Sequence, residues 1–482
     1  MSWDVGIIGG GVVGTAIARE LAGYQVRCVL LEAADDVGTG TSKANTAILH
    51  TGFDATPGTL ESRLVARGAA LLREYAERAG IAVERTGALL VAWTPEQAGS
   101  LDAIAVKSKG NGYTRLRSVS VAEVYEREPN LGPGVAGGLW IPDEWVIDPW
   151  SVPLAYATEA VRAGVDLRLG TPVTGVSVLP GGEGFELTAG AGAGPVRCRF
   201  AVNAAGLASD EVDRMFNGGG FTIRPRKGEL IVYDKLARPL LSSIILPVPT
   251  ARTKGVVLAP TVFGNVLLGP TAEDVADRSD RSTSAAGLSA LLADGRRILP
   301  GLEHEEVTAT YAGLRAATEH SDYQLGRYGR YVRVAGIRST GLTASLGIAE
   351  HVAGLLAEAG LPLKPRASVS QEEGAGQAPP RMPYLGDAGT RPYQDAGRIA
   401  ADPAYGEIAC HCERVTRGEI RDALASDIPP AGLDGLRRRT RAMNGRCQAF
   451  YCGAAVSALF GPAGSGAAVG GSAGGSGVRD GR

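Results

Sequence analysis

The 482-residue sequence has no excess of charge of either sign, because 49 Lys and Arg residues oppose 51 Asp and Glu residues and leave a formal net charge of -2. This balance gives no electrostatic reason to expect nucleic acid or an anionic membrane as a partner. Runs of about 18 apolar residues are also absent, and the first residues lack the basic and apolar segments of a signal peptide. We therefore expect a cytoplasmic protein without a transmembrane segment and with a small uncharged or anionic ligand.

Cysteine is scarce, yet four of the six cysteines lie close together. Cys410 and Cys412 stand in EIACHCER, and Cys447 and Cys452 stand in RCQAFYC. A disulfide, a zinc site, an iron–sulfur cluster and coincidence are all open explanations. A reducing compartment disfavours a disulfide, and zinc knuckles usually have C-x2-4-C spacing, which C-x-C does not meet. The other two, Cys28 and Cys198, lie in apolar strand-like runs, where cysteine packs as a small hydrophobe.

Strand-like and helix-like segments alternate from the start of the chain, as in DVGIIGG, VVGTAIARELAGY and VRCVLLE. This alternation is typical of a doubly wound parallel sheet. From about residue 80 to residue 330, short strand-like runs such as GALLVAW, ELIVYD and NVLLGP alternate with turn signals, which indicates an antiparallel sheet inserted as a second lobe. The chain then returns to a strand and a helix at YVRVAGIRSTGLTASLGIAEHVAGLLAEAG.

We therefore predict an α/β fold with several domains. A Rossmann-like dinucleotide-binding domain comprises residues 1–80, 145–215 and 310–365, and an antiparallel-sheet substrate domain comprises residues 81–144 and 216–309. Residues 366–400 are rich in Gly, Pro and charge and form a surface connector, residues 401–460 form a small helical domain with the cysteines, and residues 461–482 are a low-complexity, disordered tail.

A dinucleotide site is indicated at GIIGGGVVG, where Gly9, Gly11 and Gly14 stand in G-x-G-x-x-G register between a strand and a helix. Gly9 permits a tight turn, Gly11 lets the backbone approach a pyrophosphate, and Gly14 lets the helix pack closely on the strand. Glu32 ends the next strand, where a carboxylate can accept a hydrogen bond from the adenosine ribose. No second such fingerprint occurs, so a separate nicotinamide domain is not expected.

Longer segments carry a family resemblance: GTSKANTAILHTGFDATPGTLESRLVARG, GGLWIPDEWVIDPW, RPRKGELIVYD, LPVPTARTKGVVLAPTVFGNVLLGPTAED and YAGLRAAT. Together they resemble FAD-dependent glycerol-3-phosphate dehydrogenases of the anaerobic, iron–sulfur-bearing type and L-2-hydroxyglutarate dehydrogenases, within the D-amino-acid-oxidase superfamily. The resemblance implies hydride transfer from a carbon bearing a hydroxyl or amine to flavin N5. Where relatives often have S-P-G-L-T-A-S, this chain has Thr340 in place of the proline, which fixes the turn less.

The same resemblance implies the residues that contact FAD. AVNAAGLASDEV is similar to the later strand and turn that complete the FAD site, and STGLTASLGIAEHV is similar to the helix whose positive N-terminal end faces the isoalloxazine. Besides the residues of the glycine fingerprint and Glu32, the implied cofactor-binding residues are Ser42, Asn45, Val173, Ala205, Gly206, Gly313, Gly341, Leu342 and Thr343.

The cysteine-bearing segments, CHCERVTRGEIRDAL and LDGLRRRTRAMNGRCQAFYCG, resemble the domain first described in bacterioferritin-associated ferredoxin. That resemblance implies a 2Fe-2S cluster held by Cys410, Cys412, Cys447 and Cys452, with His411 on the surface. The basic run from Arg437 to Arg441 is either a solvated helix face or a positive charge that tunes the cluster or docks an acidic partner.

Two residues are implied at the reacting centre. His50, in AILHTGF, suits a general base that takes a hydroxyl proton, although it could merely hydrogen-bond the loop. Arg315, in YAGLRAAT, suits an anionic substrate group because its guanidinium forks onto carboxylate or phosphate. Lys254 is a weaker candidate for the same role, and Glu229 could equally be structural.

The leading hypothesis is a flavin and iron–sulfur dehydrogenase that acts on glycerol 3-phosphate or a 2-hydroxy acid and passes electrons through the cluster to a protein or quinone. Two alternatives stay open: an amine or amino-acid oxidoreductase of the same superfamily, and an electron-relay subunit of a larger complex, so a hetero-oligomer is possible. The sequence does not fix the substrate.

Overall fold

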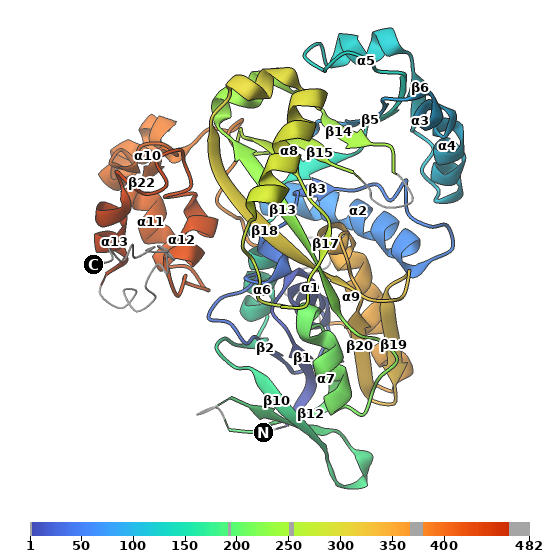
Figure 1. The fold of residues 1–482 in the computed structure, drawn as a ribbon. Coiled ribbons are helices and arrows are strands. Elements are labelled where there is room, and N and C mark those ends of the chain that lie inside the picture. The colour runs from blue at the N-terminus through green and yellow to red at the C-terminus, as the bar shows by residue number, and fades with distance from the viewer. Residues whose placement is uncertain (1, 191–193, 250–254, 367–378, 462–482) are drawn as a thin grey trace, which may run out of the picture.

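A computed structural model describes residues 2–190, 194–249, 255–366 and 379–461. An eight-stranded sheet lies at the bottom of Figure 1. Along one path its order is β10 (Val173–Val178), β11 (Phe185–Ala189), β12 (Val196–Asn203), β1 (Trp3–Ile8), β2 (Cys28–Leu31) and β9 (Asp166–Arg168), and β20 (Tyr331–Ala335) pairs with β12 and with β19 (Gln324–Tyr328). Strands β9, β2, β1, β12 and β20 are parallel, so their carboxyl ends share one edge.

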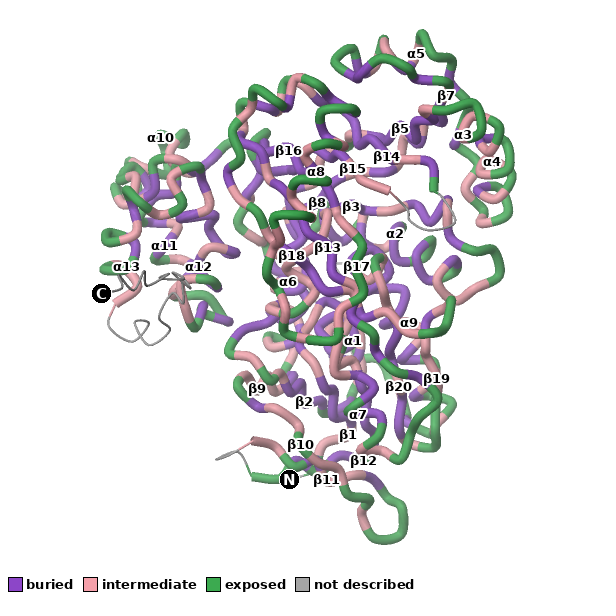
Figure 2. The backbone as a smooth tube through the Cα atoms, in the orientation of Figure 1, coloured by how far each residue is buried: buried purple, intermediate pink, exposed green. Residues whose placement is uncertain are grey.

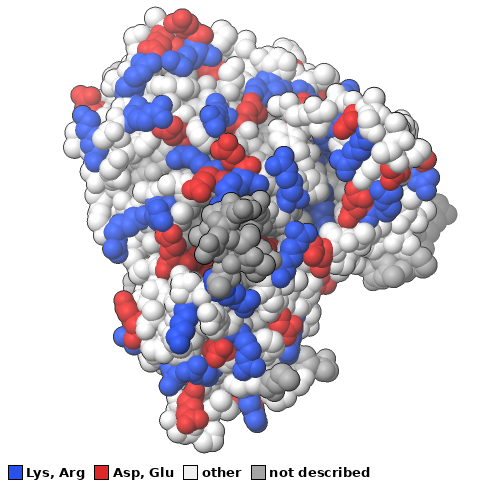
Figure 3. Space-filling view, turned by 180° about the vertical axis from the view of Figure 1, so that it is seen from behind, with Lys and Arg blue, Asp and Glu red and all other residues white. Residues whose placement is uncertain are grey.

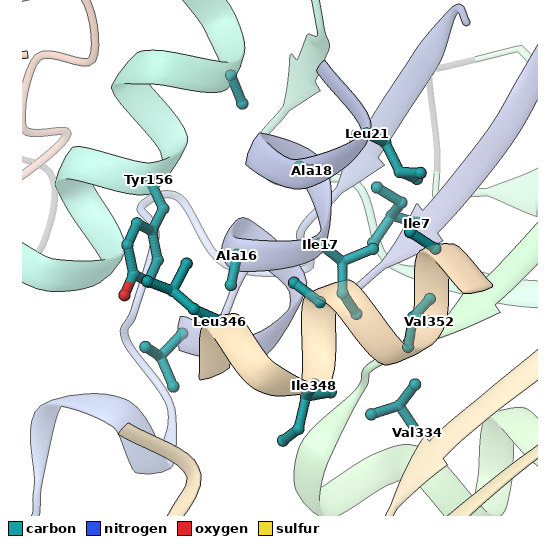
Figure 4. Close-up of a cluster of buried hydrophobic side chains, with 14 of the residues drawn as sticks. Ile7, Ala16, Ile17, Ala18, Leu21, Tyr156, Val334, Leu346, Ile348 and Val352 are labelled. Carbon is teal, nitrogen blue, oxygen red and sulfur yellow. The ribbon is translucent and has the colours of Figure 1, made fainter. Parts of the chain in front are cut away.

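Helices α1 (Val12–Ala22), α6 (Ser151–Arg162) and α9 (Gly341–Glu358) pack around this sheet, and α2 (Leu60–Ala79) packs on α9. Figure 4 shows Ile17 of α1 between α1 and α9, with Leu346, Ile348 and Val352 on α9 and Tyr156 on α6. Small residues allow this close packing: a Cβ on Gly68 would lie 2.3 Å from the Thr343 carbonyl oxygen. The start of α9 is thereby held against α2.

The second sheet has nine strands and forms the upper lobe in Figure 1. Its order is β17 (Glu273–Asp274), β13 (Arg224–Tyr233), β16 (Val266–Gly269), β15 (Val257–Pro260), β14 (Ile244–Pro247), β5 (Ala88–Ala92), β7 (Gly137–Ile141) and β6 (Arg117–Val119), and β18 (Val307–Ala317) pairs along β13. The pairs are antiparallel except β5 with β14, which differs from the purely antiparallel expectation. The long β13–β18 pair runs down to the first sheet.

Shorter elements complete the lobe and join it to the first sheet. A three-stranded sheet of β3 (Ile48–Leu49), β8 (Trp145–Ile147) and β4 (Val83–Glu84) links the two parts. Around the lobe lie α3 (Pro95–Gly99), α4 (Leu101–Gly110), α5 (Val121–Arg127) and α8 (Ala285–Ile298), and α7 (Ser209–Met215) lies on the first sheet. In Figure 2 the buried positions follow the strands of both sheets, whereas exposed positions gather on α4 and α5. On the face in Figure 3, acidic and basic side chains are interspersed, as the balanced composition predicts.

Residues 392–461 form a compact C-terminal unit beside the body of the molecule, drawn in orange and red in Figure 1. It contains α10 (Ala396–Ala401), the hairpin of β21 (Ile408–Cys410) and β22 (Val415–Thr416), α11 (Arg417–Leu424), α12 (Leu433–Thr440) and α13 (Gly453–Phe460). Of the predicted connector, residues 367–378 lie outside the described structure, as do residues 462–482 of the predicted tail. Residues 379–391, which directly precede the C-terminal unit, cross the body of the molecule. There the Met382 N–H donates to the Ala79 carbonyl and Leu385 is buried.

The basic run on α12 faces the body of the molecule. Arg438 and Arg439 are buried and both donate to the carboxylate of Asp36, which is 2% exposed, with N–O distances of 2.7 Å. Arg441 is buried too and lies over the Phe263 ring. Of the two interpretations of this run, the solvated helix face is therefore wrong, and the acidic group that Arg438 and Arg439 dock onto belongs to the same chain.

The Asp36 carboxylate should control how firmly the C-terminal unit is held. Asp36→Asn would leave Arg438 and Arg439 buried with an incomplete partner, a change that costs about 3–5 kcal/mol at buried ion pairs. Hydrogen–deuterium exchange should report faster exchange over residues 427–441, and limited proteolysis should release the unit sooner.

Asp427→Asn is the matched control, since Asp427 makes a 2.7 Å pair with Arg162 at the same interface but on its exposed edge. Exposed pairs contribute about 1 kcal/mol or less, so this variant should exchange like the wild type. Equal protection of the unit in Asp36→Asn and the wild type would contradict the role given to Asp36.

Candidate functional site

The glycine fingerprint folds into the turn between β1 and α1. Gly9 has a φ of +108°, and a Cβ on Gly14 would lie 1.8 Å from the Gly9 carbonyl oxygen. A Cβ on Gly11 would meet only the Ser42 hydroxyl, at 3.3 Å, so this backbone faces open space. Gly11 supplies no side-chain cap to α1, and although the Ser42 hydroxyl accepts from the Val12 N–H, the first turn of the helix has further N–H groups for a phosphate. The turn fits the pyrophosphate of a dinucleotide.

Glu32 follows β2 at the same sheet edge. Its carboxylate accepts hydrogen bonds from the N–H groups of Gly10 and Ala34, and burial raises its pKa. The Thr171 N–H donates to the Glu32 carbonyl, which brings the segment leading into Val173 beside it. A carboxylate oxygen has two lone pairs, so Glu32 retains capacity for a ribose hydroxyl.

The segment from Thr41 to Thr51 runs along the opening between the two sheets. Ser42 accepts from the Val12 N–H at the start of α1, and Asn45 donates to the Ser42 carbonyl at 2.7 Å. A Cβ on Gly313 would lie 2.2 Å from the Ala44 carbonyl oxygen, so β18 packs directly on this segment. The structure thus brings Ser42, Asn45 and Gly313 together.

Two further predicted cofactor segments reach the same edge. Ala205 and Gly206 follow β12, and the Ala205 N–H donates to the Asn203 side chain. Gly341, Leu342 and Thr343 open α9, and its N-cap residue Thr340 caps no N–H of the helix. Thr340 stands where relatives have proline, and its hydroxyl instead bonds to Glu61 and Tyr323, which fixes the turn by other means.

His50 is held by a buried carboxylate that the sequence did not reveal. Its Nδ1 lies 2.9 Å from Oε2 of Glu144, which is fully buried, and its backbone N–H donates to the Thr343 hydroxyl. The other Glu144 oxygen accepts from the Thr51 N–H and hydroxyl. The carboxylate orients the imidazole with Nε2 turned away from it, as a general base requires. Glu144 lies within GGLWIPDEWVIDPW, but nothing local in that segment marks it as a partner of His50.

Arg315 lies on β18 directly opposite Arg226 on β13. Burial lowers the pKa of Arg315, and the positive charge of Arg226 lowers it further. Among the described residues no carboxylate pairs with its guanidinium. A desolvated guanidinium beside a second positive charge favours an anionic ligand. Lys254, the weaker candidate, lies outside the described residues.

Glu229 is structural. It is buried on β13 and accepts from the N–H and hydroxyl of Ser284, the N-cap of α8. It therefore fixes the start of a helix rather than contacting the opening between the sheets.

The four clustered cysteines converge within the C-terminal unit, and none of the six cysteines forms a disulfide. The sulfurs of Cys410 and Cys452 lie 3.5 Å apart, and those of Cys412 and Cys447 form a second contact. Among the described residues, no group of three or more His, Cys, Asp or Glu side chains is placed to hold a metal ion. Two thiol pairs suit the two irons of a 2Fe-2S cluster.

The backbone is wound tightly around these thiols. The N–H of Tyr451 lowers the pKa of the Cys447 thiol, assisted by those of Ala449 and Phe450, while burial raises the pKa of Cys452 to about 12. In the described structure, five of the seven non-glycine residues with positive φ belong to this unit: Arg414, Arg441, Met443, Gln448 and Ala449. Such backbone conformations concentrate at functional sites.

His411 is exposed, as predicted. Beside Cys412 a polar cavity of about 530 Å³ opens between the unit and the body. It is lined by Lys235, Arg391, Arg414, Asp387 and Glu413, among others. By contrast, Cys28 and Cys198 are buried in the body, and burial raises the pKa of each thiol to about 12, as expected for packing residues.

Comparison with known proteins identifies the family. Residues 4–355 match the family model described as FAD dependent oxidoreductase. The chain belongs to this family. Residues 408–461 of this FAD dependent oxidoreductase match the BFD-like 2Fe-2S binding domain. Its cofactors are therefore FAD and a 2Fe-2S cluster, and the arrangement of glycines, helix N-termini and thiols described above fits both.

Three relatives place the oxidoreductase more closely. It is 32% identical to a glycerol 3-phosphate dehydrogenase from Caloramator mitchellensis over 453 residues, covering 93% of this chain and 92% of the relative. It is 29% identical to the human mitochondrial L-2-hydroxyglutarate dehydrogenase, covering 56% of this chain and 61% of the relative. The dithionite-reduced L-α-glycerophosphate oxidase of Mycoplasma pneumoniae with FAD bound has a TM-score of 0.72 at 26% identity, covering 76% of this chain and 97% of that one.

Among the described residues, no helix combines the length and apolar character needed to cross a bilayer.

The body and the C-terminal unit meet beside the segment that carries Ser42, since Lys43 pairs with Asp434 at 2.8 Å. The Trp150 indole donates to the Lys43 carbonyl, and its ring stacks on Phe263, which Arg441 covers. The joint between the C-terminal unit and the body therefore includes the residue that directly follows Ser42.

Glu144→Gln should lower kcat without lowering FAD content. An amide has one acceptor oxygen, so it cannot serve both Thr51 and the His50 ring as the carboxylate does. We expect a loss of about tenfold or more, smaller than the about 100- to 10,000-fold that removal of a general base costs. Steady-state kinetics and the flavin spectrum measure the two effects.

Glu128→Gln is the matched control, because Glu128 is equally buried and accepts backbone N–H groups from Ser242 and Ser243, away from His50. An unchanged kcat in Glu144→Gln, or an equal fall of kcat in both variants, would show that Glu144 has no specific role in positioning His50.

Proposed function

We propose that this oxidoreductase is a dehydrogenase of glycerol 3-phosphate, located in the cytoplasm, that delivers electrons to an acceptor protein or quinone. Its residues 1–80, 145–215 and 310–365 form the FAD-binding domain, and residues 81–144 and 216–309 form the substrate domain. The observation that carries the substrate is the Arg315 guanidinium, which no carboxylate of the described residues pairs with and which Arg226 faces, on the strand that packs against the His50 segment.

Each group has a role that its surroundings support. When bound, the flavin supplies the acceptor for a hydride and the cluster supplies single-electron transfer. Arg315 binds the phosphate of the substrate bidentately, and Arg226 adds positive charge that attracts the dianion. His50 takes the proton of the substrate hydroxyl at Nε2, and Glu144 holds the ring and stabilises its cationic form.

The C-terminal unit supports electron exit through Cys410, Cys412, Cys447 and Cys452. The Mycoplasma pneumoniae protein named an oxidase matches 73% of this chain while 94% of its own length is covered. The relative named a dehydrogenase matches 93% of this chain, which is too much to omit the whole unit. We infer that the unit supplies an electron exit that replaces oxygen as the acceptor.

The test is to mix the purified protein anaerobically with sn-glycerol 3-phosphate and to follow the absorbance of the oxidised flavin at about 450 nm. Rapid bleaching is expected. Bleaching by L-2-hydroxyglutarate instead would favour a 2-hydroxy acid as the substrate, in line with the similarity to the 29% identical L-2-hydroxyglutarate dehydrogenase. Bleaching only by amines, or only by a reduced partner protein, would replace the proposal with an amine oxidoreductase or an electron-relay subunit.

Arg315→Lys should raise KM for glycerol 3-phosphate and leave FAD content intact. A lysine is a point charge and cannot form the two parallel hydrogen bonds of a guanidinium. Loss of one charge-assisted bond costs about 1.5–3 kcal/mol, roughly a 10- to 150-fold rise in KM.

Arg224→Lys is the control, since Arg224 is exposed on the same strand pair opposite Ala317. It should leave KM unchanged. A wild-type KM in Arg315→Lys for every accepted anion would show that Arg315 does not bind substrate.

Cys412→Ser should separate substrate oxidation from electron exit. Substrate-driven bleaching in an anaerobic single turnover should stay near the wild-type rate, because His50 and Arg315 are untouched. Steady-state turnover with the physiological acceptor should collapse, and the iron content and its spectroscopic signal should fall.

His411→Ala is the control, because His411 lies between two of the thiols in sequence but is exposed. It should keep iron and turnover. Zinc in place of iron in the wild type, or fast turnover in air with stoichiometric peroxide that survives Cys412→Ser, would show that the cysteines carry no electrons.

A further inference from the structure

The loop between Cys447 and Cys452 carries the most exposed large hydrophobic side chains of the described structure. Phe450 is 84% exposed and Tyr451 is 79% exposed, and their rings meet edge to face with centroids 5.1 Å apart. Aromatic side chains are seldom left in water unless they serve an interaction. These two project from the loop that supplies two of the four clustered thiols.

The apolar character continues onto α13. Ala454, Ala455 and Ala458 are exposed on one face of that helix, which lies on the outer side of the C-terminal unit in Figure 1. From Cys447 to Gly461 the chain has no charged residue, although 21% of all residues are charged. We call Gln448, Phe450, Tyr451, Ala454, Ala455 and Ala458 the cluster-edge patch.

The patch is rigidly tied to the thiols. The Phe450 N–H donates to the Cys447 carbonyl, the Gly453 N–H donates to the Ala449 carbonyl, and Gln448 and Ala449 both have positive φ. Cys447, at the start of this loop, is partly exposed, whereas Cys452, at its end, is buried, and the two exposed aromatic residues stand between them in the chain. Whatever covers the rings therefore lies next to the cluster ligands.

The size and composition of the cluster-edge patch indicate what kind of partner can cover it. A stable dimer interface needs about 20–30 residues a side, far more than the patch offers, whereas transient electron-transfer complexes bury less. Residues 462–482 follow the patch in sequence, but they contain no Leu, Ile, Met or aromatic residue that could cover two rings. A membrane surface would call for several basic residues around the apolar ones, but the segment from Cys447 to Gly461 has none and the adjacent Arg446 is paired with Asp234.

We propose that the cluster-edge patch is the docking surface for an electron-carrier protein whose redox centre is reached through an uncharged, apolar face. This proposal rests on the proposed electron exit through the cluster. Each encounter moves one electron from the reduced cluster to the oxidised centre of the carrier, with no bond made and no proton moved. Docking through uncharged groups is insensitive to salt, unlike docking steered by charge.

The test uses oxidised azurin, a blue-copper electron-transfer protein, as the probe. The holoprotein is reduced with dithionite, freed of reductant by gel filtration and mixed anaerobically with azurin, whose loss of blue colour gives a second-order rate constant. Phe450→Ser with Tyr451→Ser should lower that constant about tenfold or more, as expected for the loss of two aromatic anchors. The wild-type constant should change little between low and high salt.

Three controls accompany the double variant. Val106→Ser with Val178→Ser removes exposed apolar surface elsewhere and should leave the constant unchanged. Phe450→Leu with Tyr451→Phe keeps the apolar surface and should retain most of it. Every variant should reduce ferricyanide at the wild-type rate. This small anion can enter the polar cavity beside Cys412, which is lined by Lys235, Arg391 and Arg414.

Binding supplies a readout that needs no electron transfer. Broadening of azurin amide signals by the oxidised wild-type protein should be lost with the double serine variant. The proposal is overturned by a wild-type rate constant in that variant, by a wild-type rate that falls steeply with salt, or by no reaction of azurin with the reduced wild type. A dimer that dissociates on substitution, or co-sedimentation with phosphatidylcholine and phosphatidylglycerol vesicles that depends on the two rings, overturns it as well.

Because the cluster is reduced by dithionite, this test does not depend on substrate oxidation. Loss of azurin reduction in the double variant, in a protein whose flavin no hydroxy substrate bleaches, would uphold the docking surface and refute the proposed substrate. Bleaching by glycerol 3-phosphate with azurin reduction unaffected by the substitutions would do the reverse.

Discussion

The buried carboxylate of Asp36 fixes the relation between the two redox parts of the molecule. It accepts from Arg438 and Arg439 of the C-terminal unit and lies only a few residues before Ser42, on the segment that leaves β2. A chain that carries electrons from a flavin to a cluster needs a constant distance between them. An ion pair buried at the joint supplies it, because a shift of the unit would strand charged groups away from water.

The energetics of this joint favour specificity over raw stability. Desolvation offsets much of the Coulomb energy of a buried ion pair, so Asp36 adds less net stability than its three short hydrogen bonds suggest. What it penalises is misplacement, because the remaining partners, Asp434 for Arg438 and two carbonyl groups for Arg439, belong to the C-terminal unit itself and would move with it. The peripheral pairs, Lys43 with Asp434 and Arg446 with Asp234, are more exposed and add a modest amount each.

Local sequence predicts the parts of the site that depend on local geometry. The fingerprint glycines are recognisable because Gly9 needs a positive φ and Gly14 touches the Gly9 carbonyl, and both requirements act within six positions. The cysteine spacing likewise predicts a metal-binding unit. Glu144 escapes such reasoning because it meets His50 across 94 positions, through the pairing of β3 with β8. The facing of Arg226 and Arg315 depends on strand register, which the sequence alone does not specify.

The arginine run of α12 likewise depends on a long-range contact that the sequence does not reveal. Five residues with four arginines on a short helix look like a solvated surface, and only the approach of Asp36 from 402 positions away turns two of them inward. Three of the four arginines are buried, and Arg438 and Arg439 pair with Asp36 at the joint between the C-terminal unit and the body. The segment from Cys447 to Gly461 carries no charged residue, unlike the lining of the cavity beside Cys412. An apolar contact of few residues forms without steering and separates without breaking ion pairs, as contact with a carrier that must leave after each electron requires.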